Sequence, residues 1–486
     1  MGTEERTANN ISYYICEAIM VILMFSGFFI HGGALPDYGW QVLFIFFGLM
    51  FGWSVVGLII PSLLGIIALG FLEGNTVLSV WAEGFSDNII ALIILFGILA
   101  KWMERIGLSD SLINWFMRLK FLRGRPWVFI GCFLFIVYII GFMVGAIPAI
   151  LISWAFTYTI CAHVGYEKRS PFCAFLVVNI ACVAAQGGYC KPWGSWGLVA
   201  LKAYQTVVPE GVIDYVTFIG WTSLVFLSAD VLMLLLGKYI LRIDTEKLRH
   251  FDFSSIASSN RKVTGVEKFA GILFIAMIIL LFIPGYLPGC AIKQGLNTIG
   301  IVGTVLAILV IVGLARDQSG KDIFQFGQLA AMKGAIPWSA VMLLTATIPL
   351  GSALKSKDAG IMSIISGFAK THMLGMSDFV FYCIIAVFMG LLTQVAHNVV
   401  LMVSVSPIFV TIAGSIGASG EVVILIATVV LGAALGTPAA STRAAMVFGN
   451  TEYVGLKDAY LYGWVTFLAM LITTLFIGVP VAVALL

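Results

Sequence analysis

Long apolar runs, separated by short polar segments, follow one another along almost the whole chain. A helix needs about twenty apolar residues to cross a bilayer, and many of these runs reach that length. The spacing predicts an all-α polytopic membrane protein with about eleven transmembrane helices and two shorter helical pairs, interpreted as re-entrant hairpins. An outer-membrane barrel would instead show short segments of alternating polarity.

The polar breaks divide the chain into four parts. We expect an N-terminal span with an outer loop at 1–39, a first repeat at 40–240, a cytoplasmic connector at 241–268 and a second repeat at 269–486. Lysine and arginine concentrate in 101–125 and 238–268, and the positive-inside rule places these two basic loops in the cytoplasm.

The two repeats show the same order of features: a hairpin, a tip where the chain breaks, an apolar helix, and then a helix that is itself broken. In the first repeat the hairpin is predicted at 89–121, the tip at 144–146 and the broken helix at 171–203. In the second repeat they are predicted at 338–372, 397–399 and 422–448. Inverted repeats with discontinuous helices at matching positions are typical of secondary transporters.

Composition agrees with a membrane protein. Hydrophobic residues make up 60% of the chain and charged residues 10%, whereas a soluble protein carries roughly 25% charged residues. The net charge of +3 is small and the chain has no basic tract of the kind that binds nucleic acid, so no nucleic-acid partner is expected. We expect an integral multi-pass protein of a bacterial plasma membrane, with the lipid bilayer and a small anionic substrate as its partners.

Polar side chains gather in the apolar stretch 391–409, where Gln394, His397 and Asn398 lie close together. Polar groups at membrane depth cost free energy unless they face a partner, a cavity or a ligand. Asn398 can both donate and accept hydrogen bonds, which suits a carboxylate, although an amide that only packs two helices together is the alternative. His397 is a candidate ligand or proton-sensitive group, and a structural histidine is an equally good interpretation.

The two broken helices supply the remaining site candidates. The motif GGYCKPWGSWG contains Gly188, Gly194 and Ser195, and the second break contains Thr437 and Pro438. An unwound helix exposes backbone groups, and the positive end of a half-helix attracts an anion. A kinked helix with a purely structural role is the alternative.

Each break also carries a cation, Lys191 in the first and Arg443 in the second. An arginine offers a planar fork of donors to a carboxylate, and a lysine offers a compact positive charge. The alternative is that these side chains reach to the membrane interface and have no part in binding.

From Trp40 onward the chain resembles, at low identity, the divalent anion:sodium symporter family of the ion transporter superfamily, the INDY-type dicarboxylate and citrate transporters. The second tip keeps Asn398 in TQVAHNV at the asparagine of the family's Ser-Asn-Thr tip, while the first tip reads Val144-Gly145-Ala146. The resemblance implies a homodimeric elevator-type carrier of di- or tricarboxylates, with Gly145 and Ala146 at the substrate. It also implies a sodium ion near Asn398 and Thr437, and no other cofactor.

Because the first tip has no side-chain oxygen and each break carries a cation, the sequence favours sodium-independent anion exchange. A sodium- or proton-coupled symporter of the same superfamily is the first alternative. A cation/proton antiporter is more distant, since it needs paired acids and the spans offer Asp230 alone. No enzyme is expected, because the chain has none of the protease, zinc or aspartate-rich motifs of intramembrane enzymes, and no P-loop.

Overall fold

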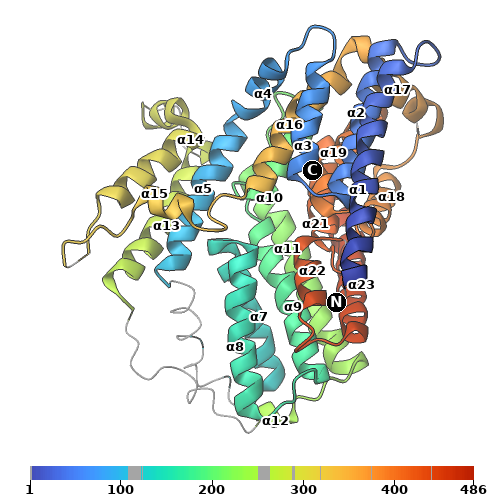
Figure 1. Ribbon diagram of the computed structural model, residues 1–486. Coiled ribbons are helices and arrows are strands. Elements are labelled where there is room, and N and C mark those ends of the chain that lie inside the picture. Colours follow the sequence, from blue (N-terminus) through green and yellow to red (C-terminus); the bar gives the residue numbers. More distant parts are fainter. Residues whose placement is uncertain are drawn as a thin grey trace.

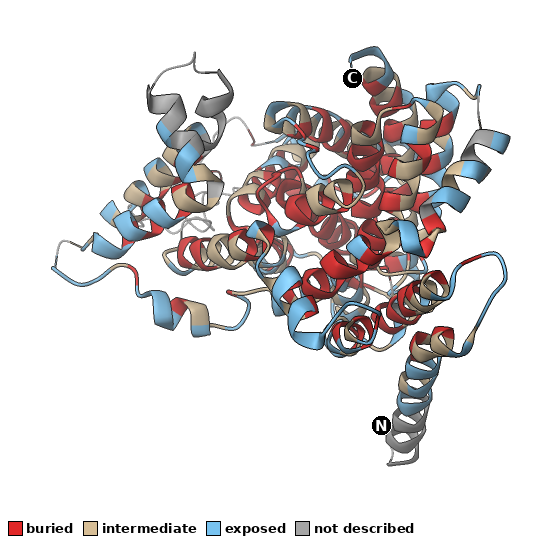
Figure 2. Cartoon of the chain, turned by 90° about the horizontal axis from the view of Figure 1, so that it is seen from above, coloured by how far each residue is buried: buried red, intermediate tan, exposed pale blue. Residues whose placement is uncertain are grey.

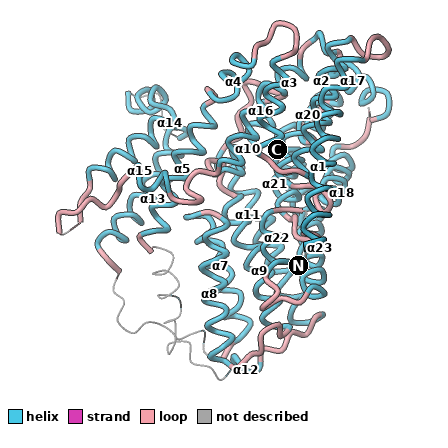
Figure 3. The backbone as a smooth tube through the Cα atoms, in the orientation of Figure 1, coloured by secondary structure: helices cyan, strands magenta, loops and turns pink. Residues whose placement is uncertain are grey.

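A computed structural model describes residues 3–485 except 108–115, 117–121, 123, 250–262, 287–290, 318, 374 and 439. Helices make up the described regular structure (Figure 1, Figure 3), which confirms the predicted all-α class. Within this part of the chain six helices are long and apolar enough to cross a membrane, or seven if one bent pair forms a single span. The count of about eleven stays a prediction, because the other apolar helices are shorter.

The first half of the chain contains eleven of the described α-helices and ends in a short basic helix. They are α1 (Thr3–Ser26), α2 (Asp37–Val55), α3 (Ile59–Gly70), α4 (Val77–Phe85), α5 (Asn88–Arg105), α7 (Pro126–Val144), α8 (Ala146–Val164), α9 (Pro171–Tyr189), α10 (Ser195–Gln205), α11 (Tyr215–Leu235) and α12 (Glu246–Arg249).

The second half begins with a helical pair that lies to one side of the body in Figure 1. Its helices are α13 (Gly265–Tyr286), α14 (Ala291–Leu314), α15 (Phe326–Ala331), α16 (Trp338–Lys355), α17 (Ile361–His372), α18 (Asp378–Leu392), α19 (Asn398–Ser404), α20 (Ser406–Ile416), α21 (Gly420–Gly432), α22 (Thr442–Gly449), α23 (Leu456–Thr473) and α24 (Val479–Leu485).

A first helical hairpin is formed by α7 and α8, which double back at Gly145 and both pack against α9. Gly145 has φ 96°, a conformation that only glycine adopts readily. The start of α8 lies at the end of α9, because a Cβ on Gly188 would be 3.2 Å from the Ala146 nitrogen. Further along, the Trp154 indole donates to the Val177 carbonyl at 2.9 Å, so α8 runs antiparallel to α9.

A second hairpin repeats this design with α18 and the pair α19–α20, packed against α21. The Tyr382 hydroxyl contacts the Ser419 backbone at the start of α21, and Gln394 contacts Gly436 just past its end. Therefore α18 runs parallel to α21, and the chain turns back at 393–397. The tip predicted at 144–146 contains the turn at Gly145, and the tip predicted at 397–399 lies at the start of α19, directly after the second turn.

The two units, each a hairpin with its broken helix, meet where α9 and α21 end. A Cβ on Gly432 would lie 3.2 Å from the Tyr189 ring, so the C-terminal ends of the two helices approach each other. Beyond the first break, α10 runs alongside α21, and the Trp196 indole donates to the Thr428 carbonyl at 3.3 Å. Beyond the second break, α22 runs alongside α9. This exchange of half-helices gives the inverted arrangement that the repeats predicted.

The re-entrant hairpins expected at 89–121 and 338–372 stay predictions. The first of these segments begins with one continuous helix, α5, and most of its second helix lies outside the described residues. In the second segment, α16 packs mainly on α3 and α4 and α17 mainly on α20, and the two helices also contact each other. A short apolar helix followed by lysines marks a helix end, and it does not by itself say where the chain turns back.

The centre of the molecule is the most buried part, as Figure 2 shows, and the outer helices carry the exposed apolar side chains. The helix α9 is almost wholly buried inside the protein. The described ends of the two basic loops lie together: α12 packs near α7, and the Lys247 ammonium donates to the Gly165 carbonyl at 2.7 Å. The described ends of the two loops therefore lie on the same side of the molecule, and their cytoplasmic location stays a prediction.

Candidate substrate site

A cavity of about 330 Å³ lies between the two hairpin tips and the two helix breaks. Four helices begin at its wall, namely α8 at Ala146, α10 at Ser195, α19 at Asn398 and α22 at Thr442. The start of a helix carries about half a positive elementary charge together with free backbone N–H groups. Four such ends around one cavity favour an anionic occupant.

On the side of the first repeat, the wall is formed mainly by backbone and by one cation. Lys191 is 9% exposed, and its ammonium donates to the Phe142 carbonyl at 3.0 Å. Gly194 is needed beside it, because a Cβ there would lie 2.8 Å from carbons of the lysine side chain. Since the stem of Lys191 folds over Gly194, the charge stays at the cavity and does not reach the membrane interface.

On the side of the second repeat, Arg443 is the largest polar group. Its side chain is 2% exposed; one guanidinium nitrogen donates to the Gly432 carbonyl, and the group lies 5.1 Å from the centre of the Tyr189 ring. The other two nitrogens, Nε and Nη1, are buried without a hydrogen-bond partner among the described residues. Buried donors in this state are costly unless a ligand satisfies them.

Asn398 presents a further free donor. Its backbone N–H donates to the Ala440 carbonyl at 3.1 Å, and its Oδ1 accepts the Val399 N–H at 2.9 Å. These bonds hold the residue in place, while its Nδ2 is buried and has no partner in the described part of the chain. His397 caps the same helix, since its Nδ1 lies 3.4 Å from the Val399 nitrogen.

Nine of the eleven predicted site residues line this cavity. They are Gly145, Ala146, Gly188, Lys191, Gly194, Ser195, His397, Asn398 and Arg443. Thr437 and Pro438 do not line it. Instead the Thr437 hydroxyl donates to the Gln394 carbonyl, and Gln394 Oε1 accepts the Gly436 N–H at 2.8 Å. Through these two hydrogen bonds Gln394 connects the second tip to the second break.

Sequence reasoning missed several cavity residues. Tyr189 supplies an aromatic face to Arg443, and Ser441 and Thr442 stand where α22 begins. A serine ahead of an apolar run is a helix-start signal that marks this second set. Lys101 and Glu104 also line the cavity, and the sequence gives no sign that α5 approaches it.

The residues that the resemblance assigns to sodium do not fit such an ion. Val144, Gly145 and Ala146 have no side-chain oxygen, and Asn398 Oδ1 already accepts a backbone N–H. The Thr437 hydroxyl is bonded to a carbonyl and lies off the cavity wall. Hard cations bind oxygen-rich sites, whereas the buried atoms without a partner on the described residues that line the cavity are the N–H groups of Asn398 and Arg443.

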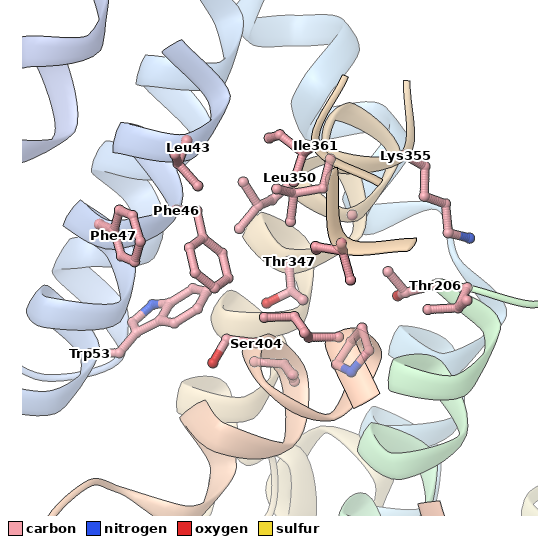
Figure 4. A pocket seen from close by; sticks show the side chains of 17 residues that line it. Leu43, Phe46, Phe47, Trp53, Thr206, Thr347, Leu350, Lys355, Ile361 and Ser404 are labelled. Carbon is pink, nitrogen blue, oxygen red and sulfur yellow. The ribbon is translucent and has the colours of Figure 1, made fainter. Parts of the chain in front are cut away.

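A second cavity, of about 150 Å³, has a different character. Leu43, Phe46, Leu350 and other apolar side chains form its wall (Figure 4). The hydroxyls of Thr347 and Ser404 face it, but each donates to a carbonyl of its own helix, at 2.7 and 2.6 Å respectively. The ammonium of Lys355, on the same wall, already donates to the Gln205 carbonyl at 3.2 Å. We place the substrate in the first cavity, where buried donors have no partner among the described residues.

Two inverted units with broken helices around an N–H-lined cavity define a multi-pass membrane transporter of the ion-carrier type. The citrate transporter family model (CitMHS) matches residues 41–432, and the chain belongs to this family. The family confirms the resemblance to carboxylate transporters seen in the sequence. No curated protein matches the chain.

A solved structure gives the same fold. The crystal structure of the Alcanivorax borkumensis YdaH transporter, which was described as having an unusual topology, is similar with a TM-score of 0.59 and 13% sequence identity. The match covers 93% of this chain and 99% of that chain. At this identity the likeness concerns the fold alone.

Proposed function

We propose that the protein is a secondary carrier for small organic anions, di- or tricarboxylates, and that it works as an elevator-type homodimer. The observation that supports this most directly is the set of buried donors without a partner, Asn398 Nδ2 and Arg443 Nε and Nη1, on a cavity where four helices begin. A carboxylate accepts several hydrogen bonds at once and brings the negative charge that these groups need.

The membership in the citrate transporter family supports carboxylates as the substrate class. The cavity has room for a molecule of that size, since its 330 Å³ compares with about 30 Å³ per water molecule. One carboxylate would lie against Arg443 and Asn398, and a second against Lys191 and the backbone of the first repeat. Such a substrate would contact both units at once, which an elevator needs if they are to move together.

We further propose that transport is an exchange of anions without sodium. Lys191 and Arg443 are fixed in the protein, so their charge cannot leave the site when the substrate does. An uncompensated charge at membrane depth is costly, and the empty carrier would therefore return across the bilayer slowly. A carrier that binds an anion during both the inward and the outward transition avoids this cost.

The test uses purified protein in liposomes that are preloaded with citrate or left empty, with sodium or choline outside. We expect strong uptake of labelled citrate only into the preloaded vesicles, and equal rates in the two cations. Strong uptake into empty vesicles that requires sodium would refute exchange and indicate symport. Uptake into empty vesicles driven by an acid-outside pH gradient would refute it in favour of proton coupling.

A further inference from the structure

The second cavity, with its apolar wall, has no part in the function proposed so far. Its volume of 150 Å³ is about ten times the space that one water molecule needs. The hydroxyls on its wall are already bonded, since Thr206, Thr347 and Ser404 each donate to the carbonyl four residues earlier, at 2.9, 2.7 and 2.6 Å. Cavities of this size and character stay dry and take up apolar molecules. We therefore expect an occupant that is apolar where it meets these walls.

The cavity is elongated and reaches the lipid-facing surface. The helix α16 lines it from Thr347 to Lys355, about 12 Å along the axis, and α2 lines it from Leu43 to Trp53, about 15 Å. Lys355 and Trp53 lie on opposite sides of it (Figure 4). Phe47 on the same wall is 46% exposed, so the cavity meets the outer apolar surface of α2. This shape suits a single hydrocarbon chain that enters from the bilayer.

One end of the cavity offers a cation. Lys355, the last residue of α16, is the one charged residue among the described residues that line the cavity. Its ammonium donates to the neutral Gln205 carbonyl at 3.2 Å, and an ammonium has three N–H groups. None of the described acids forms an ion pair with it. The remaining donors suit a carboxylate at the polar end of an apolar chain.

The charges nearest to Lys355 are engaged with other groups. Lys202 pairs with Asp87 at 2.5 Å, and the exposed Glu83 accepts the Ser352 hydroxyl at 2.6 Å, and none of these side chains lines the cavity. At the Lys355 end of the cavity α10 and α16 end and α17 begins, so these helix ends together add about half a negative charge. They offset about half of the lysine charge and leave this end of the wall positive. The end of α2 lies on the far side, beside Trp53.

We propose that this cavity binds a fatty acid from the membrane, with its carboxylate at Lys355 and its chain between α2 and α16. The opposite wall is formed by residues at the ends of α10 and α19, two helices that begin at the substrate cavity with Ser195 and Asn398. A chain held against the far ends of these short helices restrains their movement and thus slows exchange. This consequence rests on the proposed function, whereas the binding itself does not.

Photocrosslinking tests the binding on purified protein in phosphatidylcholine nanodiscs. The probe is palmitate with a diazirine on its chain, and the labelled peptides are mapped by mass spectrometry. We expect label within 43–53, 347–355 and 403–408, displaced by unlabelled palmitate and unaffected by citrate. Label confined to lipid-facing residues such as Phe476 would overturn the inference. Equal labelling of the cavity by phosphatidylcholine with the same diazirine would also overturn it, in favour of an ordinary membrane lipid.

Two substitutions test the cavity itself, with the probe below saturation. Lys355→Gln removes the charge, so labelling should fall about tenfold. Leu350→Trp fills the space and should abolish labelling, whereas Leu224→Trp is the matched control, since Leu224 is 42% exposed on α11 and does not line this cavity. If Leu350→Trp lowers the melting temperature, Lys355→Gln decides. Wild-type labelling in Lys355→Gln would refute the proposed carboxylate position.

Exchange in liposomes tests the consequence for transport. Palmitate should lower the maximal rate of citrate exchange and leave the apparent affinity for citrate unchanged, and Lys355→Gln should be far less sensitive. Competition between palmitate and citrate would place the fatty acid in the substrate cavity and refute the inference. An unchanged rate at a palmitate concentration that saturates the labelling would refute the restraint. If the protein exchanges no anion at all, the proposed function fails, while the crosslinking result still decides the binding.

Discussion

Replacing Arg443 with methionine removes the guanidinium but keeps most of the apolar stem. In the empty protein this substitution loses the bond to the Gly432 carbonyl and the contact with the Tyr189 ring, together worth about 1–3 kcal/mol. It also removes a buried charge whose Nε and Nη1 have no partner in the described residues, and such a charge costs several kcal/mol. We therefore expect the melting temperature of the empty protein to stay the same or rise.

Binding should respond in the opposite way. Charge-assisted hydrogen bonds contribute about 1.5–3 kcal/mol each, so losing the Arg443 donors should weaken citrate binding by at least ~2 kcal/mol, which is about thirtyfold. At a citrate concentration of about 100 times the wild-type Kd, the ligand stabilises the wild-type protein by about 2.7 kcal/mol. With thirtyfold weaker binding the same concentration stabilises the variant by only ~0.9 kcal/mol.

Thermal unfolding of purified protein in detergent, with and without citrate, measures both effects at once. Arg169→Met is the matched control, because Arg169 is exposed and donates to the Thr451 carbonyl away from the cavity. We expect this control to keep the full citrate-induced rise in melting temperature. The reasoning is refuted if Arg443→Met also keeps it, or if the empty variant melts several degrees lower, as the loss of a purely structural arginine would require.

Two further substitutions test the hairpin tips. Asn398→Ala should abolish citrate uptake without lowering expression, because the free Nδ2 is lost. Asn179→Ala is the control and should keep uptake, since Asn179 Nδ2 donates to its own helix. Normal uptake kinetics in the Asn398 variant would contradict the prediction. Gly145→Ala and Gly165→Ala each place a side chain at positive φ, 96° and 82°, with open space around it. Each should lower stability by about 1–3 kcal/mol, and Gly145→Ala by more, since its ψ of 168° puts it in a region that only glycine adopts readily. Only the first should slow transport, and an equal effect of both on uptake would mean that backbone strain at the tip has no special role.

The sequence allowed the two tips and the two breaks to be predicted, because each has a local cause. Gly145 interrupts a long apolar run, and the glycines before and after Lys191 unwind the next helix. Features of this kind depend on residues within one turn of each other, so a single sequence contains the information.

Which consecutive helices pack against each other could not be predicted in the same way. Whether two consecutive apolar helices lie side by side depends on how closely their backbones approach a third helix. Here the close approach uses Gly141 and Gly187, where a Cβ would lie 2.1 and 2.0 Å from carbonyls across the α7–α9 contact. Such contacts link residues far apart in the sequence, and glycine is too common in this chain to identify them.

The same limit applies to the site. Lys191 and Arg443 were identified because a cation inside an apolar helix is anomalous wherever it points. Glu104 was not identified, since it lies among Lys101 and Arg105 at the end of an apolar helix, where charged residues are ordinary. The structure adds one decisive fact about it, namely that this end of α5 forms a wall of the cavity.

The partners of the two cations show how the empty cavity tolerates them. Lys191 donates to the Phe142 carbonyl in the last turn of α7, and Arg443 donates to the carbonyl of Gly432, the last residue of α21. The end of a helix carries about half a negative elementary charge, so each cation is compensated only in part. The two helix ends together offset about one of the two positive charges, and the remainder needs an anion. The helix ends thus hold the cations at the site, and the uncompensated part of their charge supports our proposal that the loaded carrier crosses the membrane more readily than the empty one.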